Sequence, residues 1–413
     1  MGFDADVIVA GAGPAGAAAA RALAAAGVDV LLIDRAAFPR NKPCGGGIST
    51  RALHRLPWLE GAIAGIDQHV VSRLHLEGPE RAAMDLDSPR PCVLLVRRVD
   101  FDHALVREAE ARGARVMTDF EITQASTDGR AVTLQSRDGR RLSAPQVIAA
   151  DGVHSVIAKR LGVNTKWPRT QLAIDMMEET PTATLSASRP DVLWVAYAYR
   201  NLDGYAYVFP KAHHVNVGIG CLLSHFDANV SERPYELQQT FVESLVDAGV
   251  LHGRSDRGSF TPFLIPVGGP LARGWHGRVL FAGDAGGFVN PITAEGIYYA
   301  MVSGELAGKA AAAARASGSR GAAGPRYERM WRDELRTELR DATILQKYLF
   351  SSHARVASVV RGASRTPWLT DAILEYTRGE LSYQTLRRRV LLRFPLTALK
   401  LVRQRFTSRA AAL

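Results

Sequence analysis

Three glycines close to the N-terminus have the spacing of a phosphate-binding loop. Gly11, Gly13 and Gly16 form the pattern G-x-G-x-x-G directly after an apolar run, with Pro14 and Ala15 inside the pattern. The first glycine permits a tight turn, the second lets the backbone approach a pyrophosphate, and the third lets a helix and a strand pack closely. A phosphate would then lie at the positive end of the following helix. We therefore predict that these five residues bind a dinucleotide.

An acidic residue stands where such a loop needs one for the ribose. Asp34 ends a second apolar run, Val28–Ile33, and lies 18 residues beyond Gly16. A carboxylate at the end of that strand can accept hydrogen bonds from both ribose hydroxyls. We place Asp34 and the adjacent Arg35 in the cofactor site. The loop and the acid alone fit a nicotinamide cofactor as well as a flavin, because both are dinucleotides.

The elements that must position these residues alternate between strand and helix. The first 34 residues read as a strand, an Ala-rich helix and a second strand, which is a parallel pair with a crossover helix. A helix is expected over 99–112 and strands over 115–118, 132–135 and 147–150. Between about residues 165 and 265 the residue pattern changes. Runs of Val, Tyr and Trp with a period of two appear, which are typical of antiparallel sheet. These runs are Val192–Tyr199, Tyr205–Phe209 and Val215–Cys221.

The fold class predicted from this order is α/β + β. A Rossmann-like cofactor-binding domain carries an inserted antiparallel-sheet substrate domain and is followed by a C-terminal helical segment. The expected bounds are 1–65, 97–165 and 275–318 for the cofactor domain, 66–96 and 166–274 for the β-rich domain, and 325–413 for the helical region.

Two later segments narrow the choice of cofactor through a resemblance. Asp151-Gly152 follows the strand at 147–150, and Gly283-Asp284 follows the strand at 279–282. With these segments the chain resembles the FAD enzymes that are built like aromatic hydroxylases. The resemblance implies that the cofactor is FAD, that Asp151 lines it, and that Asp284 holds its ribityl hydroxyls.

The same resemblance assigns flavin contacts to a loop and an arginine. The loop runs from Pro291 to Ile297, includes Gly296, and opens a helix whose first N–H groups would favour a negatively charged reduced flavin. Arg98, which stands before the helix at 99, matches the arginine that reaches the cofactor in this group. A solvated charge at the helix entry is the alternative for Arg98.

A second motif pair narrows the resemblance to one family. The segment Cys44-Gly45-Gly46-Gly47, and the run Gly204-Tyr-Ala-Tyr-Val-Phe-Pro-Lys211, resemble the geranylgeranyl reductase family, flavoenzymes that saturate isoprenoid double bonds. The resemblance covers about residues 5–350 and implies that Cys44, Gly45 and Gly46 lie at the flavin. Two positions depart from the family pattern: Tyr207 replaces a common Trp, and Ala294 replaces a common Gly.

The chemistry that the resemblance implies needs a hydride, a proton and an apolar wall. Reduced flavin supplies the hydride. Tyr205, Tyr207 and Phe209 alternate on one strand, so the three rings share a face that could line a polyprenyl chain and ease positive charge on carbon. Cys44 is expected to place or protonate the substrate. The alternatives are a plain sheet core for the aromatic residues and a small buried hydrophobe for Cys44.

Three classes of function remain to be separated by experiment. The first is an FAD-dependent reductase of C=C bonds in a geranylgeranyl or polyprenyl chain, with NADPH or a ferredoxin as the electron donor. The second is a flavin-dependent monooxygenase acting on a hydrophobic or aromatic small molecule. The third is a flavin-holding factor without turnover. Halogenation is disfavoured, because Tyr205-Ala-Tyr207-Val-Phe209-Pro stands in place of Trp-x-Trp-x-Ile-Pro.

Composition and charge limit the setting. The 413 residues carry a net charge of +10. The last 33 residues contain eight basic residues and no acidic residue. The segment Leu386–Phe406 reads as a basic amphipathic helix, which would either contact a membrane surface or pack on the enzyme. Nucleic acid binding is disfavoured. We expect a cytoplasmic protein without metal ligands, without a secretory signal and with three free cysteines, peripheral at most on the membrane.

Overall fold

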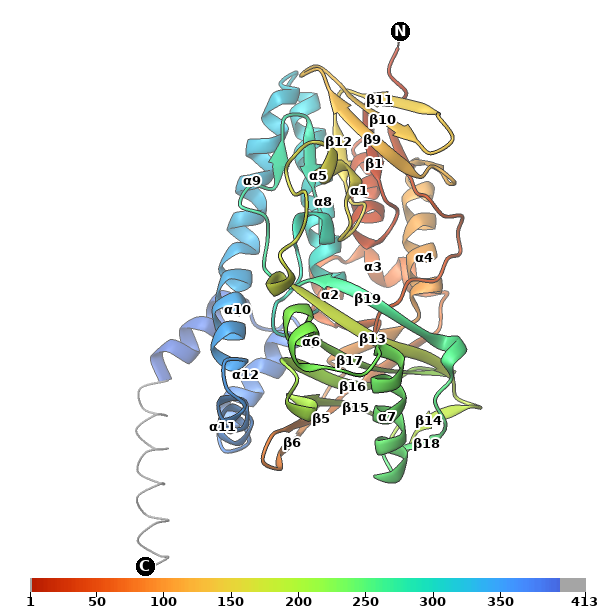
Figure 1. The fold of residues 1–413 in the computed structure, drawn as a ribbon. Helices are drawn as coiled ribbons and strands as arrows, with labels where there is room; N and C mark the ends of the chain where they lie inside the picture. Colours follow the sequence, from red (N-terminus) through yellow and green to blue (C-terminus); the bar gives the residue numbers. More distant parts are fainter. Residues whose placement is uncertain (1, 394–413) are drawn as a thin grey trace, which may run out of the picture.

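The computed structural model describes residues 2–393, and its first layer is a largely parallel sheet (Figure 1). The strands of this sheet are β1 (Val7–Ala10), β2 (Val30–Ile33), β8 (Arg115–Met117), β12 (Val147–Ala149), β20 (Trp275–His276) and β21 (Val279–Phe281). Their spatial order is β20-β21-β12-β1-β2-β8, with β20 antiparallel to β21. Since β2 and β12 flank β1 on opposite sides, the loop after β1 lies at a topological switch point, where ligands bind in such sheets.

Three helices cover one face of this sheet: α1 (Pro14–Ala25), α4 (Arg98–Ala111) and α8 (Ile297–Ala316). Small residues let α1 and α8 touch through their backbones. A Cβ at Gly304 would lie 2.0 Å from the carbonyl oxygen of Ala15, and one at Gly308 would lie 2.6 Å from that of Ala19. This pairing makes the two helices parallel, so their positive N-terminal ends point the same way.

A small antiparallel sheet packs on the opposite face. It consists of β9 (Ile122–Thr127), β10 (Val132–Ser136) and β11 (Arg141–Ala144), and the helix α5 (Val156–Arg160) lies beside β9. Val132 and Leu134 of this sheet are buried together with Ile8 and Ala10 of β1. The parallel sheet is therefore buried on both sides, as its continuous apolar strands require.

The second layer is a seven-stranded, mainly antiparallel sheet. Its strands are β5 (Arg73–Gly78), β6 (Ala82–Asp87), β13 (Leu172–Pro181), β15 (Val192–Tyr197), β16 (Gly204–Pro210), β17 (His214–Leu222) and β19 (Phe260–Pro266). Their order is β19-β13-β17-β16-β15-β5-β6, and β15 and β5 pair in parallel. The strand expected to reach Tyr199 ends at Tyr197, because Ala198 and Arg200 take left-handed backbone angles.

One face of this sheet is covered by α6 (Leu223–Asn229) and α7 (Pro234–Asp247), and the short pair β14 (Leu185–Ala187) and β18 (Leu251–Gly253) lies at its end. Figure 1 shows the other face turned toward the parallel sheet. Residues 66–96 divide between two sheets. β5 and β6 join the seven-stranded sheet. β7 (Val93–Val96) instead pairs with β4 (Gln68–Val71) on one side and with β3 (Gly47–Ser49) on the other, next to α2 (Arg51–Arg55) and α3 (Trp58–Ile63).

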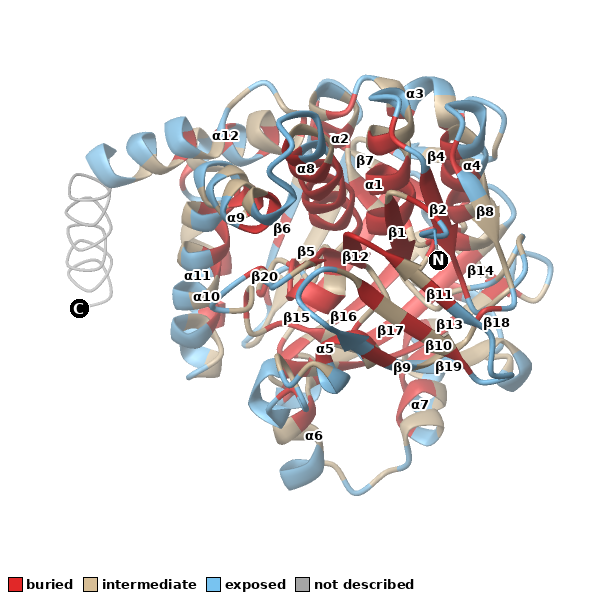
Figure 2. Cartoon of the chain, turned by 90° about the horizontal axis from the view of Figure 1, so that it is seen from above, coloured by how far each residue is buried: buried red, intermediate tan, exposed pale blue. Residues whose placement is uncertain are grey.

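Helices dominate the C-terminal part: α9 (Ala323–Glu334), α10 (Arg336–Leu349), α11 (His353–Ser364), α12 (Pro367–Thr377) and a helical stretch over 383–393. α11 packs on β6 through Ala357 and Val360, so this region closes the side of the seven-stranded sheet (Figure 1). Burial follows the two layers, with red strands inside and blue outer helix faces in Figure 2. Within residues 2–393, no helix combines the length and the apolar character needed to cross a bilayer.

Candidate active site

One cavity of about 780 Å³ is lined by both layers of the molecule. This volume lies within the range of small-molecule sites in proteins, which is about 300–1,000 Å³. One part of the wall is made of glycine loops and charged side chains at the carboxyl end of the parallel strands. The other part is made of apolar side chains from the seven-stranded sheet and the C-terminal helices. The two parts suit two different ligands.

The glycine loop after β1 forms the first part of the wall. Gly11, Gly13, Pro14 and Ala15 line the cavity, and Gly11 has a φ of +96° that suits a glycine. Gly16 packs behind the loop instead, because a Cβ there would lie 1.7 Å from the carbonyl oxygen of Gly11. The structure therefore gives the first glycines access to a ligand and gives the last one a packing role.

Asp34 is held at the end of β2 by two backbone amides. Its carboxylate accepts hydrogen bonds from the N–H groups of Ala12, at 2.7 Å, and Ala36, at 3.0 Å. Asp34 and the exposed Arg35 both line the cavity. The carboxylate is thus oriented beside the glycine loop, where a dinucleotide would place its ribose.

Arg98 is buried at the cavity wall rather than solvated at the helix entry. It is 7% exposed, and its Nε and Nη2 donate to the two carboxylate oxygens of Asp102 at 2.7 and 2.8 Å. Arg40 donates to the same carboxylate at 3.0 Å. Such paired hydrogen bonds fix the plane of a guanidinium group, so Arg98 is presented to the cavity in one orientation.

The second and third motifs also reach the cavity. Asp151 lies between β12 and α5, and its carboxylate accepts a hydrogen bond at 2.6 Å from the hydroxyl of Ser155, the N-cap residue of α5. Asp284 follows Gly283 in the turn after β21, and both line the cavity. Burial raises the pKa of Asp151 and of Asp284. Hydrogen-bond donors on a ligand would offset the cost of keeping such carboxylates charged.

The loop Pro291–Ile297 lies at the N-terminus of α8 and lines the cavity through Pro291 and residues 293–297, which include Gly296 and Ile297. Its amides at 292–295 already donate within the loop, to Asn290 and Thr293. Donors toward a cofactor would therefore come from Gly296 onward, in the first turn of the helix. The sequence predicted N–H donors to the cofactor from the whole loop, whereas the structure leaves only those at its end for this role.

Together these residues fit FAD. The loop after β1 admits close backbone approach, Asp34 is oriented for a ribose, and Asp284 faces the cavity as a buried carboxylate. The parallel helices α1 and α8 direct their positive ends toward the same region. A diphosphate and a ribose are the groups that this wall accommodates.

The Cys44–Gly47 segment packs against the aromatic strand β16. A Cβ at Gly45 would lie 2.9 Å from the ring of Phe209, and one at Gly46 would lie 2.1 Å from the carbonyl oxygen of Val96. Gly46 also has a φ of +71°. The Cys44 carbonyl oxygen accepts a hydrogen bond from Asn216 at 3.1 Å. Gly45 is thus needed because the Phe209 ring packs against the segment, and Gly46 because the backbone of β7 approaches it and its own backbone is left-handed.

Tyr205, Tyr207 and Phe209 all line the cavity beside Cys44. The ring centroids of Tyr207 and Phe209 are 4.5 Å apart, and those of Tyr205 and Tyr207 are 6.1 Å apart. Tyr205 donates its hydroxyl hydrogen to the Thr293 carbonyl oxygen at 2.6 Å, which ties the strand to the loop before α8. The three rings form a continuous aromatic wall between the two parts of the cavity.

Two titratable residues of the wall, Asp175 and Lys42, were not predicted from the sequence. Asp175 on β13 is 7% exposed and accepts a hydrogen bond from Tyr207 at 3.2 Å. Burial raises the pKa of Asp175 to about 7, and burial together with Arg98 lowers the pKa of Lys42 to about 7. The available signal was an acid at position four of an otherwise apolar strand start, Leu-Ala-Ile-Asp-Met-Met.

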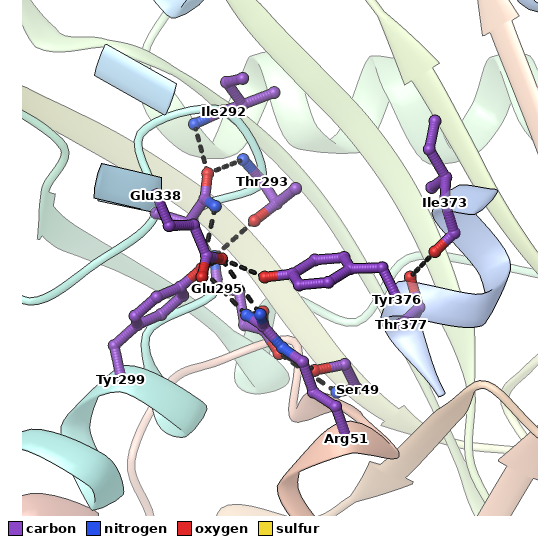
Figure 3. A network of polar contacts seen from close by, with 11 residues as sticks. Ser49, Arg51, Ile292, Thr293, Glu295, Tyr299, Glu338, Ile373, Tyr376 and Thr377 are labelled. Atoms are coloured by element: carbon purple, nitrogen blue, oxygen red, sulfur yellow. Dashed lines mark hydrogen bonds and ion pairs between the residues drawn. The ribbon is translucent and has the colours of Figure 1, made fainter. Parts of the chain in front are cut away.

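A buried network behind the loop before α8 was also missed (Figure 3). Arg51 donates to Glu338 at 3.0 Å, to Glu295 at 3.1 Å and to the Tyr299 hydroxyl at 2.9 Å. Tyr376 of α12 donates to the same Glu338 carboxylate. The network joins α2, α8, α10 and α12 to the loop. Arg51 and Glu338 lie 287 residues apart, so no local sequence pattern links them.

The second part of the cavity is apolar. Its wall combines side chains from β5, β15, the residue that follows α10, and α12: Leu74, Leu76, Leu193, Val195, Phe350 and Ile373. This wall continues from the aromatic residues of β16, so an apolar chain could extend from the flavin region toward the C-terminal helices.

Comparison with known proteins defines the class first. The FAD binding domain family matches residues 4–322, and the chain belongs to it as an FAD-dependent oxidoreductase. Within this class it belongs to the geranylgeranyl reductase family. The menaquinone reductase of Mycobacterium tuberculosis is 33% identical over 331 residues, which cover 73% of this chain and 75% of the relative. The digeranylgeranylglycerophospholipid reductase 1 of Methanothermobacter thermautotrophicus is 30% identical over 376 residues, which cover 85% and 88%.

Solved structures share the fold. A geranylgeranyl bacteriochlorophyll reductase-like protein of Thermoplasma acidophilum has a TM-score of 0.76 at 20% identity, covering 96% of this chain and 98% of that chain. The flavin-dependent brominase Bmp2 has a TM-score of 0.71 at 17% identity, covering 91% and 93%. One scaffold thus carries different reactions, and the fold alone does not set the fate of a reduced flavin.

Proposed function

We propose that the protein is an FAD-dependent reductase that saturates C=C bonds in a polyprenyl chain carried by a membrane lipid. The observation that carries this proposal is the continuity of the cavity. A wall suited to FAD passes into an apolar wall, with the rings of Tyr205, Tyr207 and Phe209 at the junction. An isoprenoid chain is long, narrow and apolar, and such a wall would exclude water around it.

Reduced FAD, when bound, supplies the hydride. The protein's first contribution is to orient the cofactor, and Asp284 and the end of the loop at Gly296 would do this. The aromatic wall would hold the alkene against it and stabilise developing positive charge on carbon. Cys44 lies beside this wall, where its Sγ accepts a hydrogen bond from the Gly46 amide at 3.4 Å. Placement of the substrate is the role we propose for it.

The substrate class follows from the apolar wall and from the relatives. A menaquinone reductase and digeranylgeranylglycerophospholipid reductases are similar over most of the chain, so we propose a prenylated quinone or a prenylated glycerolipid. Either substrate resides in a membrane. Peripheral contact through the basic C-terminal segment would bring the enzyme to it.

Mass spectrometry of a substrate panel tests the proposal. The FAD-loaded protein, chemically reduced without oxygen, is incubated with geranylgeranyl diphosphate, a geranylgeranylated glycerolipid and a menaquinone. We expect a product in which the prenyl chain of at least one of them gains pairs of hydrogen atoms, and the menaquinone ring is reoxidised before its mass is measured. An added oxygen atom after admission of air, without saturation beforehand, would instead establish the monooxygenase alternative.

The electron donor is tested in the same preparation. NADPH and a reduced ferredoxin are added separately to the oxidised protein without oxygen, and bleaching of the flavin absorbance is followed. Rapid bleaching by one of them, faster in the presence of the accepted lipid, identifies the donor.

A further inference from the structure

Asp175 is a buried acid of the cavity wall to which the proposed function has given no role. Its strand neighbours Ile174 and Met176 pack into the core on the far side of the sheet. Side chains alternate along a strand, so Asp175 takes the cavity side, where it lines the wall. A carboxyl group that is 7% exposed must either be paired with a cation or hold a proton.

The surroundings of Asp175 favour a held proton. Tyr207 donates to its Oδ2 at 3.2 Å, while the ladder neighbours Gly220 and Phe263 add no charge. The titratable groups that act on it or feel its charge come from β16, β17 and the loop after β2, and they are Tyr205, Tyr207, Cys221 and Lys42. Burial dominates these influences and raises the pKa of Asp175 to about 7.

A proton donor must also lie close to the place where the substrate reacts. Asp175 lies beside Tyr207, whose ring belongs to the aromatic wall at the junction of the cofactor part and the apolar part of the cavity. Gly218 faces Tyr207 across the β16–β17 ladder, and a Cβ there would lie 2.5 Å from the tyrosine ring. The sheet therefore leaves room for the tyrosine and holds its hydroxyl against the acid.

We propose that the Asp175 carboxyl is the proton donor of the alkene reduction and that Tyr207 is its positioning residue. This rests on the proposed function. The π bond breaks as one alkene carbon receives hydride from the reduced cofactor and the other receives the carboxyl proton of Asp175. The alkene gains two hydrogens and the cofactor is oxidised by two electrons. The carboxylate left behind recovers its proton from water.

Single-turnover kinetics test the assignment. Wild-type protein and the Asp175→Asn variant are loaded with FAD, reduced, and mixed with the lipid that the wild type saturates. We expect the variant to saturate it at least about 100-fold more slowly at pH 6.5, because a general acid contributes about 10²–10⁴-fold. In the wild type the rate should fall tenfold per pH unit above about pH 7. Equal rates in the two proteins would overturn the assignment.

A readout independent of turnover is the protonation of the carboxyl itself. Infrared difference spectra of the oxidised, FAD-loaded protein should show a carboxyl band that disappears near pH 7 and that is missing in Asp175→Asn. Tyr207→Phe should move this titration to higher pH, because the lost hydrogen bond stabilises the charged form. Tyr205→Phe is the matched control on the same strand face, since its hydroxyl donates to Thr293. A band that titrates below pH 5 would overturn the assignment.

Cys44→Ser separates the thiol from the carboxyl as proton source. We expect this variant to keep the fall in rate above about pH 7, whatever its absolute rate. Loss of that pH dependence in Cys44→Ser, with its retention in Asp175→Asn, would transfer the role to the thiol and overturn the assignment to Asp175. Absence of saturation by the wild type would refute the proposed function itself, which distinguishes the two failures.

Discussion

Ala294 illustrates how a single side chain is tolerated in the loop before α8. Its φ of +51° lies in the left-handed region, where glycine is free and other residues pay about 1–2 kcal/mol. Its N–H donates to the Asn290 carbonyl oxygen at 2.9 Å, and the Asn290 N–H donates to the Glu295 carbonyl oxygen at 3.0 Å. These two hydrogen bonds hold the turn closed. Ala294 therefore keeps the loop conformation that suits the family's glycine, at a cost in backbone free energy.

Asp284 is the residue on which cofactor retention should depend most. We predict that Asp284→Ala weakens FAD binding by about 10- to 100-fold, because a hydrogen bond to a charged group contributes about 1.5–3 kcal/mol. The measurement is the ratio of flavin to protein absorbance after gel filtration. Asp191→Ala is the control, since Asp191 is an exposed acid paired with Arg73. Full flavin content in Asp284→Ala would show that the third motif has been wrongly assigned.

At the scale of elements, two motifs far apart in sequence prove to be two sides of one contact. The segment Cys44–Gly47 packs on the ring of Phe209 of β16, which leaves no room for a side chain at Gly45 and little at Gly47. The backbone of the segment can approach the cavity only because no side chain separates it from that ring. This packing explains why both motifs occur together in the chain.

The Arg51 network couples the C-terminal helices to the cofactor loop. Arg51 and Glu338 are 7% and 8% exposed at their side chains, and burial raises the pKa of Glu338. Removing the cation leaves buried carboxylates without their partner, which costs about 3–5 kcal/mol. We therefore predict that Arg51→Ala lowers the melting temperature of the FAD-loaded protein strongly.

The pH dependence of this loss has a definite sign. Without Arg51 the pKa of Glu338 in the folded protein rises further above its value in the unfolded chain. The free energy of unfolding therefore falls as the pH rises from the unfolded-state pKa to the folded-state pKa. The deficit in melting temperature should be larger at pH 8 than at pH 5. Arg73→Ala is the control, because its ion pairs are exposed and such pairs contribute about 0–1 kcal/mol. Equal deficits at both pH values would contradict the role given to Glu338.

At the scale of the whole molecule, the basic C-terminal segment divides into arginines that contact the enzyme and residues that lie outside the described part of the chain. Arg387 pairs with Asp341 of α10 at 2.6 Å, and Arg389 pairs with Glu375 of α12 at 2.8 Å. Arg393 lies over the ring of Trp368 of α12, 5.2 Å from its centroid. These three arginines contact the enzyme, so at most five of the eight basic residues are left for another partner. The remainder of the segment predicted over Leu386–Phe406, from residue 394 on, lies outside the described residues.

Truncation after Arg393 tests membrane contact while keeping the packed helix. It removes four basic residues, each of which contributes about 1 kcal/mol near anionic lipid. We predict weaker sedimentation with vesicles that contain anionic lipid and no change with neutral vesicles. A full-length variant with these four residues changed to Gln is the matched control for charge alone. Unchanged sedimentation of both variants would leave packing on the enzyme as the explanation of the segment.

Local patterns in the sequence were sufficient for the cofactor half of this protein. The glycine spacing from Gly11 to Gly16, the acid Asp34 and the periodicity of the strands act over short distances along the chain and predict a dinucleotide-binding domain. The choice of FAD came from the resemblance of two later motifs, and both predictions are confirmed. The resemblance of the chain to the geranylgeranyl reductase family is confirmed by the relatives. These features are readable because each depends on neighbours within one supersecondary unit.

Tertiary structure alone decided which distant side chains meet. The contact between Asp175 and Tyr207, the network around Arg51 and the packing of Phe209 on the glycine segment join residues separated by 32, 287 and about 160 positions. Burial of Asp175 is likewise a property of the closed cavity, and it is burial that raises its pKa. A linear pattern contains neither the distance nor the desolvation, because both arise when the two sheets and the C-terminal helices close around one space.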